Sequence, residues 1–329
     1  MKQLSLQVLF YFRGKKKNDM ELKGLYTALV TPFTRSNHID YTSLEQLIKL
    51  QVSNGVKGIV IAGSTGEASS LNEIEYRKLI RFTKHKINEQ VQLVVGTTNN
   101  NTEKVQQNIA IAREEGADAV MIAAPYYNTP SDKGIQRHFE CIAENTNMPI
   151  ILYNVPSRTA CNISNDIIIN LAKQYDHIIG IKEASGDINK ITQLITKKPK
   201  NFKILSGDDS LTLSLIVLGA EGSVSVVSNL IPNEFNLLVN EAIKGNFHIA
   251  RRLHFFYLDL IGLMFVDTNP SPVKAALNQI SLCENTLRLP LVEVDKADFD
   301  RIGMELRSLD VGDSEFIKLS ELTQEPILN

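Results

Sequence analysis

Cysteine is scarce in this sequence, and tryptophan is absent. The 329 residues include three cysteines, Cys141, Cys161 and Cys283, which are widely spaced and odd in number. A disulfide framework is therefore not expected, and a reducing compartment suits the chain. No Cys-x-x-Cys or His-x-x-x-His spacing occurs, so the sequence contains no recognisable metal-ligand motif.

Long hydrophobic runs and an excess of one charge are also missing. No apolar stretch reaches the ~18 residues that a membrane helix needs. Residues 4–12 are largely apolar, but most nearby basic residues follow them and no small-residue cleavage site appears, which argues against a secretory signal. The 35 basic and 37 acidic residues leave a net charge of −2, so nothing favours binding to nucleic acid or to an anionic membrane. We expect a cytoplasmic protein with neither as a partner.

The sequence does contain a regular alternation of short apolar runs and helix-length amphipathic segments. Each pair occupies roughly 25–35 residues, the size of a βαβ unit. Eight such units predict an α/β fold, a (β/α)8 barrel. An open doubly wound sheet would normally carry a Gly-x-Gly-x-x-Gly turn after its first strand, and Val30–Phe33 is not one. The predicted strands are Tyr26–Val30, Gly58–Ile61, Leu93–Val95, Ala119–Ala123, Ile150–Tyr153, Ile178–Lys182, Lys203–Leu205 and Gly222–Val226.

The predicted barrel spans residues 24–245, and a helical appendix follows at 246–309. Residues 1–23 are expected to form a disordered extension, and residues 310–329 an irregular tail. The expected helices of the appendix are Phe247–Met264, Ser271–Leu282 and Lys296–Leu309.

Two helix starts are marked by the capping-box spacing, in which a polar N-cap is followed three residues later by glutamate. Thr42 with Glu45 has this spacing, and so does Asn72 with Glu75. We therefore expect helices to begin at both places.

Lys182 ends one of the predicted strands, directly after four residues that read as buried. Burying an unpaired ammonium costs several kcal/mol, so burial favours the neutral form of an amine. A neutral amine is a nucleophile that condenses with a ketone to give a Schiff base. The alternative is an ordinary strand-end lysine that pairs with Glu183.

Polar residues follow several of the other predicted strands. Active sites of such barrels lie at the C-terminal ends of the strands. Hydroxyls, phenols, an amine and a guanidinium would therefore meet at one rim, which suits ketone chemistry. Taken singly, each has an ordinary explanation as a turn, a packed aromatic, a surface ion pair or a helix start. The residues are Thr31, Ser64, Thr65, Tyr126, Tyr127, Tyr153, Arg158, Asp208 and Asp209.

Several of these segments, in this order, resemble the dihydrodipicolinate synthase branch of the pyruvate-dependent Schiff-base aldolase superfamily. The resemblance runs from about Gly24 to about Leu309, and several long motifs in the right order make it specific. The motifs are Leu29–Phe33, Gly63–Glu67, Pro125–Asn128, Leu152–Thr159, Gly180–Ala184 and Asn269–Lys274.

The resemblance implies a lyase that condenses pyruvate with aspartate-4-semialdehyde, the branch-point step of diaminopimelate and lysine synthesis. By motif position, Lys182 would form the imine with pyruvate, and Tyr153 would carry protons to and from it. Thr65 would hold the pyruvate carboxylate. A proton relay would join Tyr153, the hydroxyl of Ser64 and Tyr127. Chemistry of this kind needs no cofactor, and none is expected.

Four positions refine this expectation. Ser64 stands where the family usually has threonine, so the hydroxyl is kept but the methyl that restricts χ1 is lost. Arg158 would bind the carboxylate of the second substrate through two parallel hydrogen bonds. The resembling sialic-acid lyases lack this arginine, and sugar-acid aldolases of the superfamily are the alternative function. Gly207 and Val224 are also assigned to substrate binding.

The resemblance also bears on assembly and regulation. The tyrosine at the position of Tyr127 usually reaches the site of the neighbouring subunit, which implies a homodimer that is often doubled to a homotetramer. In lysine-inhibited relatives the effector lies at that interface, where histidines and a glutamate hold it. The matching positions here carry Glu73, Tyr76 and Lys104, so weak or absent feedback by lysine is expected.

Overall fold

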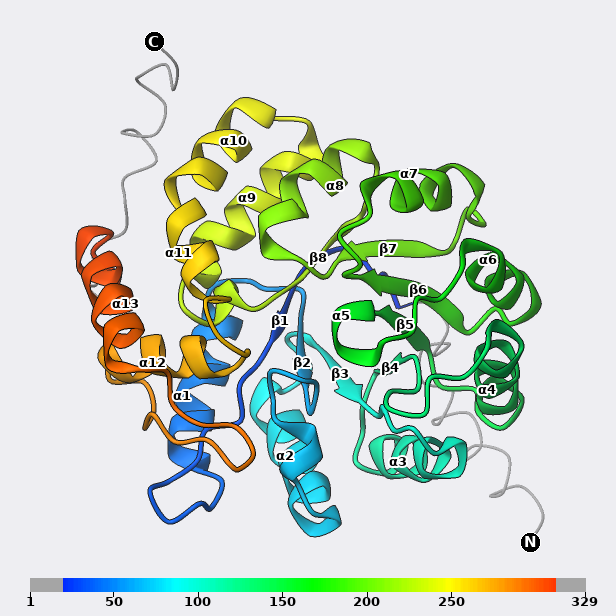
Figure 1. Cartoon of the computed structure of the whole chain (residues 1–329), viewed down its shortest axis with the longest axis horizontal. Helices are drawn as coiled ribbons and strands as arrows, with labels where there is room; N and C mark the ends of the chain where they lie inside the picture. Colours follow the sequence, from blue (N-terminus) through cyan, green and yellow to red (C-terminus); the bar gives the residue numbers. More distant parts are fainter. Residues whose placement is uncertain (1–19, 312–329) are drawn as a thin grey trace, which may run out of the picture.

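Eight parallel strands close into a barrel in chain order, and β8 pairs back onto β1. The computed structural model describes residues 20–311. Helices form an outer ring around the strands (Figure 1). The predicted (β/α)8 barrel is therefore confirmed. The strands are β1 Gly24–Ala28, β2 Gly58–Ile61, β3 Gln92–Gly96, β4 Ala119–Ala123, β5 Ile150–Asn154, β6 Ile178–Glu183, β7 Lys203–Ser206 and β8 Gly222–Ser225.

Most of the helices connect one strand to the next, and the last four follow the barrel. The α-helices are α1 Tyr41–Ser53, α2 Glu73–Ile87, α3 Thr102–Glu114, α4 Asp132–Glu144, α5 Pro156–Thr159, α6 Asn165–Gln174, α7 Ile188–Lys197, α8 Thr212–Leu218, α9 Pro232–Lys244, α10 Phe247–Phe256, α11 Leu258–Leu263, α12 Ser271–Gln279 and α13 Lys296–Ser308. Short 3-10 helices lie at η1 Ala68–Ser70, η2 Asp209–Leu211 and η3 Val227–Asn229.

Side-chain caps mark where helices begin. The Asn72 side chain accepts from the Glu75 backbone at 2.9 Å, and the Glu75 side chain accepts from the Asn72 backbone at 3.1 Å, so this predicted capping box is confirmed. The prediction for Thr42 is wrong, because Asp40 caps α1 and accepts from the backbone of Thr42 and Ser43. A carboxylate is favoured there because the helix dipole places positive charge at the N-terminus.

Inward-facing and outward-facing strand residues form two apolar regions. Tyr26 and Leu205 face into the barrel, whereas Leu25 packs beneath the helices. Tyr26 is fully buried, and its hydroxyl donates to the side chain of Gln92 at the start of β3. A Cβ on Gly58 would lie 2.5 Å from the Tyr26 ring, so this close approach requires glycine. The Tyr26 side chain therefore fills part of the barrel interior near the start of β3.

The segment before β1 also packs against the barrel. Leu22 is 1% exposed and belongs to the inner apolar cluster. The expectation of disorder therefore does not hold at Leu22, whose apolar side chain is buried. The rest of the predicted extension and nearly all of the predicted tail, residues 1–19 and 312–329, lie outside the described residues.

The C-terminal helices lie along one side of the barrel (Figure 1). The single helix predicted for residues 247–264 is wrong, because the chain breaks at Tyr257 into α10 and α11. The reason lies in the packing, since α10 lies against α9 whereas α11 lies against α13 and η2. The segment between α11 and α12 returns towards the barrel.

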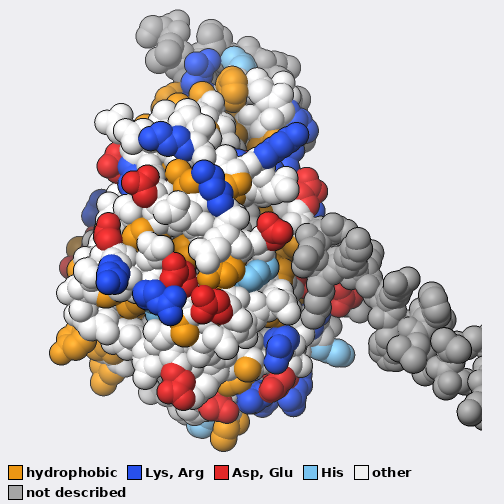
Figure 2. All heavy atoms as spheres, turned by 90° about the vertical axis from the view of Figure 1, so that its right-hand side faces the viewer, with side chains coloured by type: hydrophobic (Ala, Val, Ile, Leu, Met, Phe, Trp, Pro, Cys, Tyr) orange, Lys and Arg blue, Asp and Glu red, His pale blue; other side chains and the backbone are white. Residues whose placement is uncertain are grey.

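The outer surface carries no dominant charge on the face that α4 and α6 occupy. Figure 2 shows lysine and arginine interspersed there with aspartate and glutamate. This mixture agrees with the near-zero net charge of the chain. Between residues 20 and 311, no helix is both long enough and apolar enough to cross a membrane.

Candidate active site

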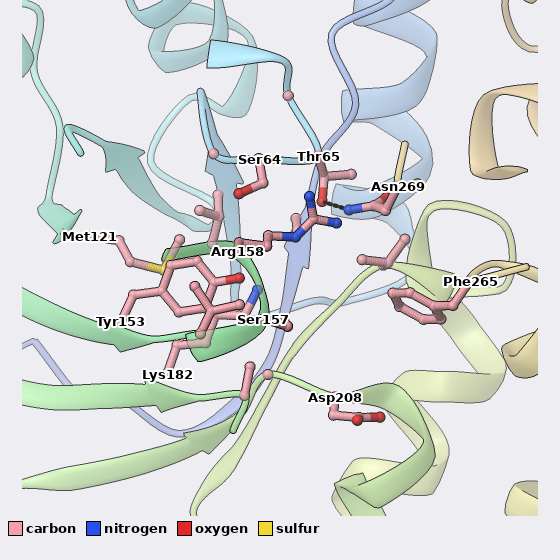
Figure 3. A pocket seen from close by; sticks show the side chains of 18 residues that line it. Ser64, Thr65, Met121, Tyr153, Ser157, Arg158, Lys182, Asp208, Phe265 and Asn269 are labelled. Carbon is pink, nitrogen blue, oxygen red and sulfur yellow. Dashed lines mark hydrogen bonds between the residues drawn. The ribbon is translucent and has the colours of Figure 1, made fainter. Parts of the chain in front are cut away.

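A cavity of about 200 Å³ opens at the C-terminal end of the barrel. Its walls come from strand ends, from the loop Gly63–Glu67 after β2 (the glycine loop), from α5 and from the segment before α12 (Figure 3). Parallel strands place their C-terminal ends at one edge, which explains how residues far apart in sequence meet here. Of the residues singled out from the sequence, seven line this cavity: Ser64, Thr65, Tyr153, Arg158, Lys182, Gly207 and Asp208.

Lys182 and Tyr153 reach the cavity from neighbouring strands (Figure 3). The two residues are direct partners in the pairing of β5 with β6, and both are buried. The Lys182 amine, Nζ, lies 4.6 Å from the centroid of the Tyr153 ring. Within residues 20–311 no salt bridge includes Lys182. The amine is therefore shielded from water and free to meet a ligand in the cavity.

Glu183 does not pair with Lys182, so the alternative reading of this lysine is wrong. Successive strand residues point to opposite faces, and Glu183 lies on the outer face of β6. Its carboxylate accepts from Lys190 Nζ and from Asn154 Nδ2, each at 3.0 Å, and from the Ser185 backbone at 2.8 Å. These bonds satisfy the buried charge of Glu183, and no other carboxylate of residues 20–311 pairs with Lys182.

The glycine loop presents its two hydroxyls differently. Thr65 is buried, whereas Ser64 is exposed. The loop is held from β1, because Thr31 Oγ1 donates to the Gly66 carbonyl at 2.7 Å. Glu67 ends the loop with a left-handed backbone, at a φ of 51°. The loop therefore has a defined shape in which Thr65 faces the interior.

A buried ion pair joins the glycine loop to the helical appendix. Lys274 of α12 and Glu67 form a salt bridge, with side-chain exposures of 0% and 1%. Lys274 also donates to the Thr286 carbonyl at 2.8 Å, and Glu67 accepts from the Arg288 backbone at 3.0 Å. Lys274 Nζ lies 4.3 Å from the centroid of the Phe33 ring. Neither member of the pair was predicted from the sequence to have a role.

Asn269 makes a second contact from the appendix, and this residue was not predicted from the sequence to belong to the site. It is 6% exposed, lines the cavity, and donates from Nδ2 to Thr65 Oγ1 at 2.9 Å (Figure 3). The one available signal was its place at the start of the Asn269–Lys274 motif, which lies outside the predicted barrel.

Arg158 lies on α5, the short helix that follows β5. It lines the cavity, and its side chain extends towards the glycine loop (Figure 3). The segment between α5 and α6 is held by Asn154, whose side chain donates to Asn162 and accepts from the Ile163 backbone, each at 2.9 Å. Arg158 itself is exposed, so an anionic group that enters the cavity meets an available guanidinium.

Comparison with known proteins decides the family. A sequence profile of the dihydrodipicolinate synthetase family matches residues 21–308. The chain belongs to this family. It is 39% identical over 293 residues to the 4-hydroxy-tetrahydrodipicolinate synthase of Parabacteroides distasonis, with 89% of this chain and 99% of the relative covered.

Solved structures agree with this assignment to the dihydrodipicolinate synthetase family. The dihydrodipicolinate synthase of Aquifex aeolicus superposes with a TM-score of 0.86 at 36% identity, over 89% of this chain and all of that one. A structure described as a monomeric dihydrodipicolinate synthase variant gives a TM-score of 0.85 at 36% identity, over 87% and 96% of the two chains. The resemblance in the sequence is thereby confirmed.

Gly207 and Val224 take different places in this member of the family. A Cβ on Gly207 would lie 2.8 Å from Lys182 Cε, so glycine is needed beside the amine. Val224 is buried in the inner apolar cluster with Tyr153. The cavity is lined instead by Val226, which directly follows β8. The binding role assigned to Val224 stays a prediction.

Asp208 and Asp209 also differ from each other. Asp208 caps η2 by accepting from the Ser210 backbone at 2.9 Å, as expected of a helix start. Asp209 is buried, and its carboxylate accepts from the backbone of Val226 and Val227 at 2.9 and 2.8 Å. Burial raises the pKa of Asp209 to about 6.

Among residues 20–311 no cluster of three or more His, Cys, Asp or Glu side chains is arranged to hold a metal ion.

A larger cavity of about 510 Å³ shares Ser64, Tyr153 and Arg158 with the first. Tyr126 lines it, whereas Tyr127 lines neither cavity and is 89% exposed, with a φ of 73°. The structure therefore does not bring Tyr127 to the cavity of its own chain.

Glu73, Tyr76 and Lys104, which the sequence resemblance relates to effector binding, all line the larger cavity. Lys104 Nζ lies 4.0 Å from the Glu73 carboxylate and donates to Gln107 at 3.2 Å. The hydroxyl of Tyr76 donates to the Gly96 carbonyl at 2.9 Å, and burial raises the pKa of this phenol. The positions thus hold a paired cation and a neutral phenol.

Proposed function

We infer that this chain is a 4-hydroxy-tetrahydrodipicolinate synthase. Such an enzyme is a lyase that condenses pyruvate with L-aspartate-4-semialdehyde in diaminopimelate and lysine synthesis. The observation that carries the proposal is the environment of Lys182. Its amine is buried, forms no salt bridge within residues 20–311, and lies 4.6 Å from the centroid of the Tyr153 ring. Arg158 at the same cavity suits a second substrate with a carboxylate, and it argues against the sugar-acid aldolases.

The proposed reaction begins when the Lys182 amine attacks the carbonyl carbon of pyruvate and water leaves, which gives an imine. Loss of a proton from the methyl carbon turns the imine into an enamine. The enamine carbon then attacks the aldehyde carbon of aspartate semialdehyde, and the aldehyde oxygen takes up a proton. Attack of the semialdehyde's own amine on the imine carbon closes the ring and releases Lys182.

The other site residues are proposed to bind substrates and to move protons. The phenol of Tyr153 lies beside Lys182 and would exchange protons with the imine. Thr65 would hold the pyruvate carboxylate, and Arg158 would bind the carboxylate of the second substrate. Ser64 would connect Tyr153 to a tyrosine that arrives from another subunit.

A homodimer, or a homotetramer built from two dimers, is part of this proposal. Tyr127 is an exposed aromatic whose left-handed backbone is uncommon for such a residue. Exposed apolar side chains also occur at Ile74 and Leu289, which adjoin residues of the larger cavity. Contact with a second chain would cover them and bring Tyr127 to the partner's relay.

A cytoplasmic location is proposed as well. It is supported by the three cysteines, which form no disulfide. We propose no cofactor, because every step of the reaction is supplied by an amine, hydroxyls and the two substrates.

The test is trapping of the imine. The chain is incubated with pyruvate, reduced with borohydride and weighed intact, and the modified peptide is then mapped. We expect one reduced pyruvate adduct per chain, on Lys182, and none in a Lys182→Arg variant or without pyruvate. An adduct on another lysine, or no adduct, would refute the proposal. Turnover of pyruvate with aspartate semialdehyde, compared with release of pyruvate from N-acetylneuraminate, separates the proposed function from its alternative.

A further inference from the structure

The segment that leads into α12 contributes a buried amide to a cavity built mainly by the barrel. Asn269 is 6% exposed, and its Nδ2 donates to Thr65 Oγ1 at 2.9 Å. Its Oδ1 is buried and has no hydrogen-bond partner among the described residues. Asn269 lines both the smaller and the larger cavity. Its amide is therefore placed between the appendix and the ligand space.

The direction of this hydrogen bond sets what Thr65 offers to a ligand. A hydroxyl has one hydrogen and two lone pairs, and one lone pair of Thr65 is taken by Asn269. Within residues 20–311 Asn269 is the sole hydrogen-bond partner of the Thr65 side chain. The hydroxyl hydrogen consequently points away from Asn269 and meets no acceptor in the described part of the chain. An anionic carboxylate in the cavity is the acceptor that this arrangement favours.

We propose that Asn269 is a positioning residue that holds the Thr65 hydroxyl as a donor for the pyruvate carboxylate. This inference rests on the proposed function. It assigns part of pyruvate recognition to the helical appendix, outside the barrel.

The same two segments are clamped at a second point. Lys274 lies five residues after Asn269, and Glu67 lies two residues after Thr65, and the two form the buried ion pair between the loop and α12. Two contacts fix the relative placement of two segments more firmly than one, so the amide of Asn269 is held ready before pyruvate binds.

A double-mutant cycle tests whether Asn269 acts through Thr65. The variants are Thr65→Val, Asn269→Ala and the combination of the two. The readout is the half-saturating pyruvate concentration, at which borohydride trapping reaches half its maximal rate in the absence of aspartate semialdehyde. Loss of one hydrogen bond to a charged group predicts that Thr65→Val raises this concentration about tenfold. We expect Asn269→Ala to raise the half-saturating pyruvate concentration several-fold. The double variant should need no more pyruvate than Thr65→Val alone.

The isosteric Asn269→Asp variant gives a second test, in which the volume of the side chain is unchanged. Its carboxylate would accept a hydrogen bond from the Thr65 hydroxyl and repel the carboxylate of pyruvate. We therefore expect the half-saturating pyruvate concentration to rise tenfold or more, with little change in the half-saturating concentration of aspartate semialdehyde. The matched control is Asn278→Ala in α12, where Nδ2 donates to the Cys283 carbonyl at 3.0 Å away from the cavity. This control should bind pyruvate as the unaltered chain does.

The possible outcomes separate the two proposals. Unaltered chains that give no Lys182 adduct would refute the proposed function and this inference with it. If the adduct forms but Asn269→Ala and Asn269→Asp need no more pyruvate than the unaltered chain, this inference alone is refuted. It is also refuted if the increase in the double variant equals the product of the two single increases, because Asn269 would then act independently of Thr65.

Discussion

The buried pair of Lys274 and Glu67 should dominate the stability of the glycine loop. The perturbation is Lys274→Met, which keeps most of the side-chain volume and removes the charge. Both side chains are essentially inaccessible to water, at 0% and 1% exposure. The change would leave Glu67 as a buried carboxylate whose one remaining donor among residues 20–311 is the Arg288 backbone at 3.0 Å. The Thr286 carbonyl would lose its donor as well.

The size of the effect follows from this burial. Removing one partner of a buried ion pair typically costs about 3–5 kcal/mol, because the other charge is left uncompensated. That is a large share of the roughly 5–15 kcal/mol that stabilises a typical domain. Adding Glu67→Gln to Lys274→Met removes the stranded charge and keeps an acceptor for Arg288. The double variant should therefore be more stable than the single Lys274→Met variant.

The assay is urea unfolding followed by circular dichroism, with thermal melting as a second measurement. Lys296→Met is the matched control, since Lys296 pairs with Asp300 at the surface with 86% of its side chain exposed. The control should unfold at the same urea concentration as the unaltered chain. Two results contradict the reasoning: a Lys274→Met variant within about 1 kcal/mol of the unaltered chain, or a double variant that is less stable than the single one.

Three further predictions concern catalysis and regulation. Arg158→Ala should lower kcat/KM for aspartate semialdehyde by an amount that corresponds to about 2–4 kcal/mol, because a two-bond contact with a carboxylate is lost, while imine formation with pyruvate continues. A specificity constant within a few-fold of normal would place Arg158 elsewhere. Tyr127→Phe should lower kcat by ~10²–10⁴-fold with little effect on pyruvate binding, and a near-normal kcat would leave Tyr127 as an interface aromatic only. Lysine should inhibit weakly. Lys104 lies 4.0 Å from Glu73, at a position that the family resemblance assigns to binding the effector's ammonium. Like charges a few ångströms apart cost on the order of 1–4 kcal/mol. Steady-state assays at saturating pyruvate test this, and half-inhibition below about 1 mM lysine would contradict it.

Several features of the fold and the candidate site could be predicted from the sequence because they depend on local pattern. The apolar runs that became β2 and β4 were placed residue for residue, since strands buried on both faces are continuous in hydrophobicity. Asn72 was placed as a cap because its partner Glu75 is three residues away. The position of Lys182 at a strand end followed from the same apolar pattern, and the barrel topology then placed it at the rim with Tyr153.

Tertiary structure alone decided which distant segments meet. Asn269 and Thr65 are 204 residues apart in the chain, and no local pattern relates a residue of the appendix to a loop after β2. The same holds for Lys274 and Glu67, whose separation is 207 residues. The break at Tyr257 depends on α10 and α11 packing against different neighbours. A sequence specifies hydrophobic period and caps over a few residues, whereas these contacts exist only after the appendix has folded back onto the barrel and excluded water from the interface between them.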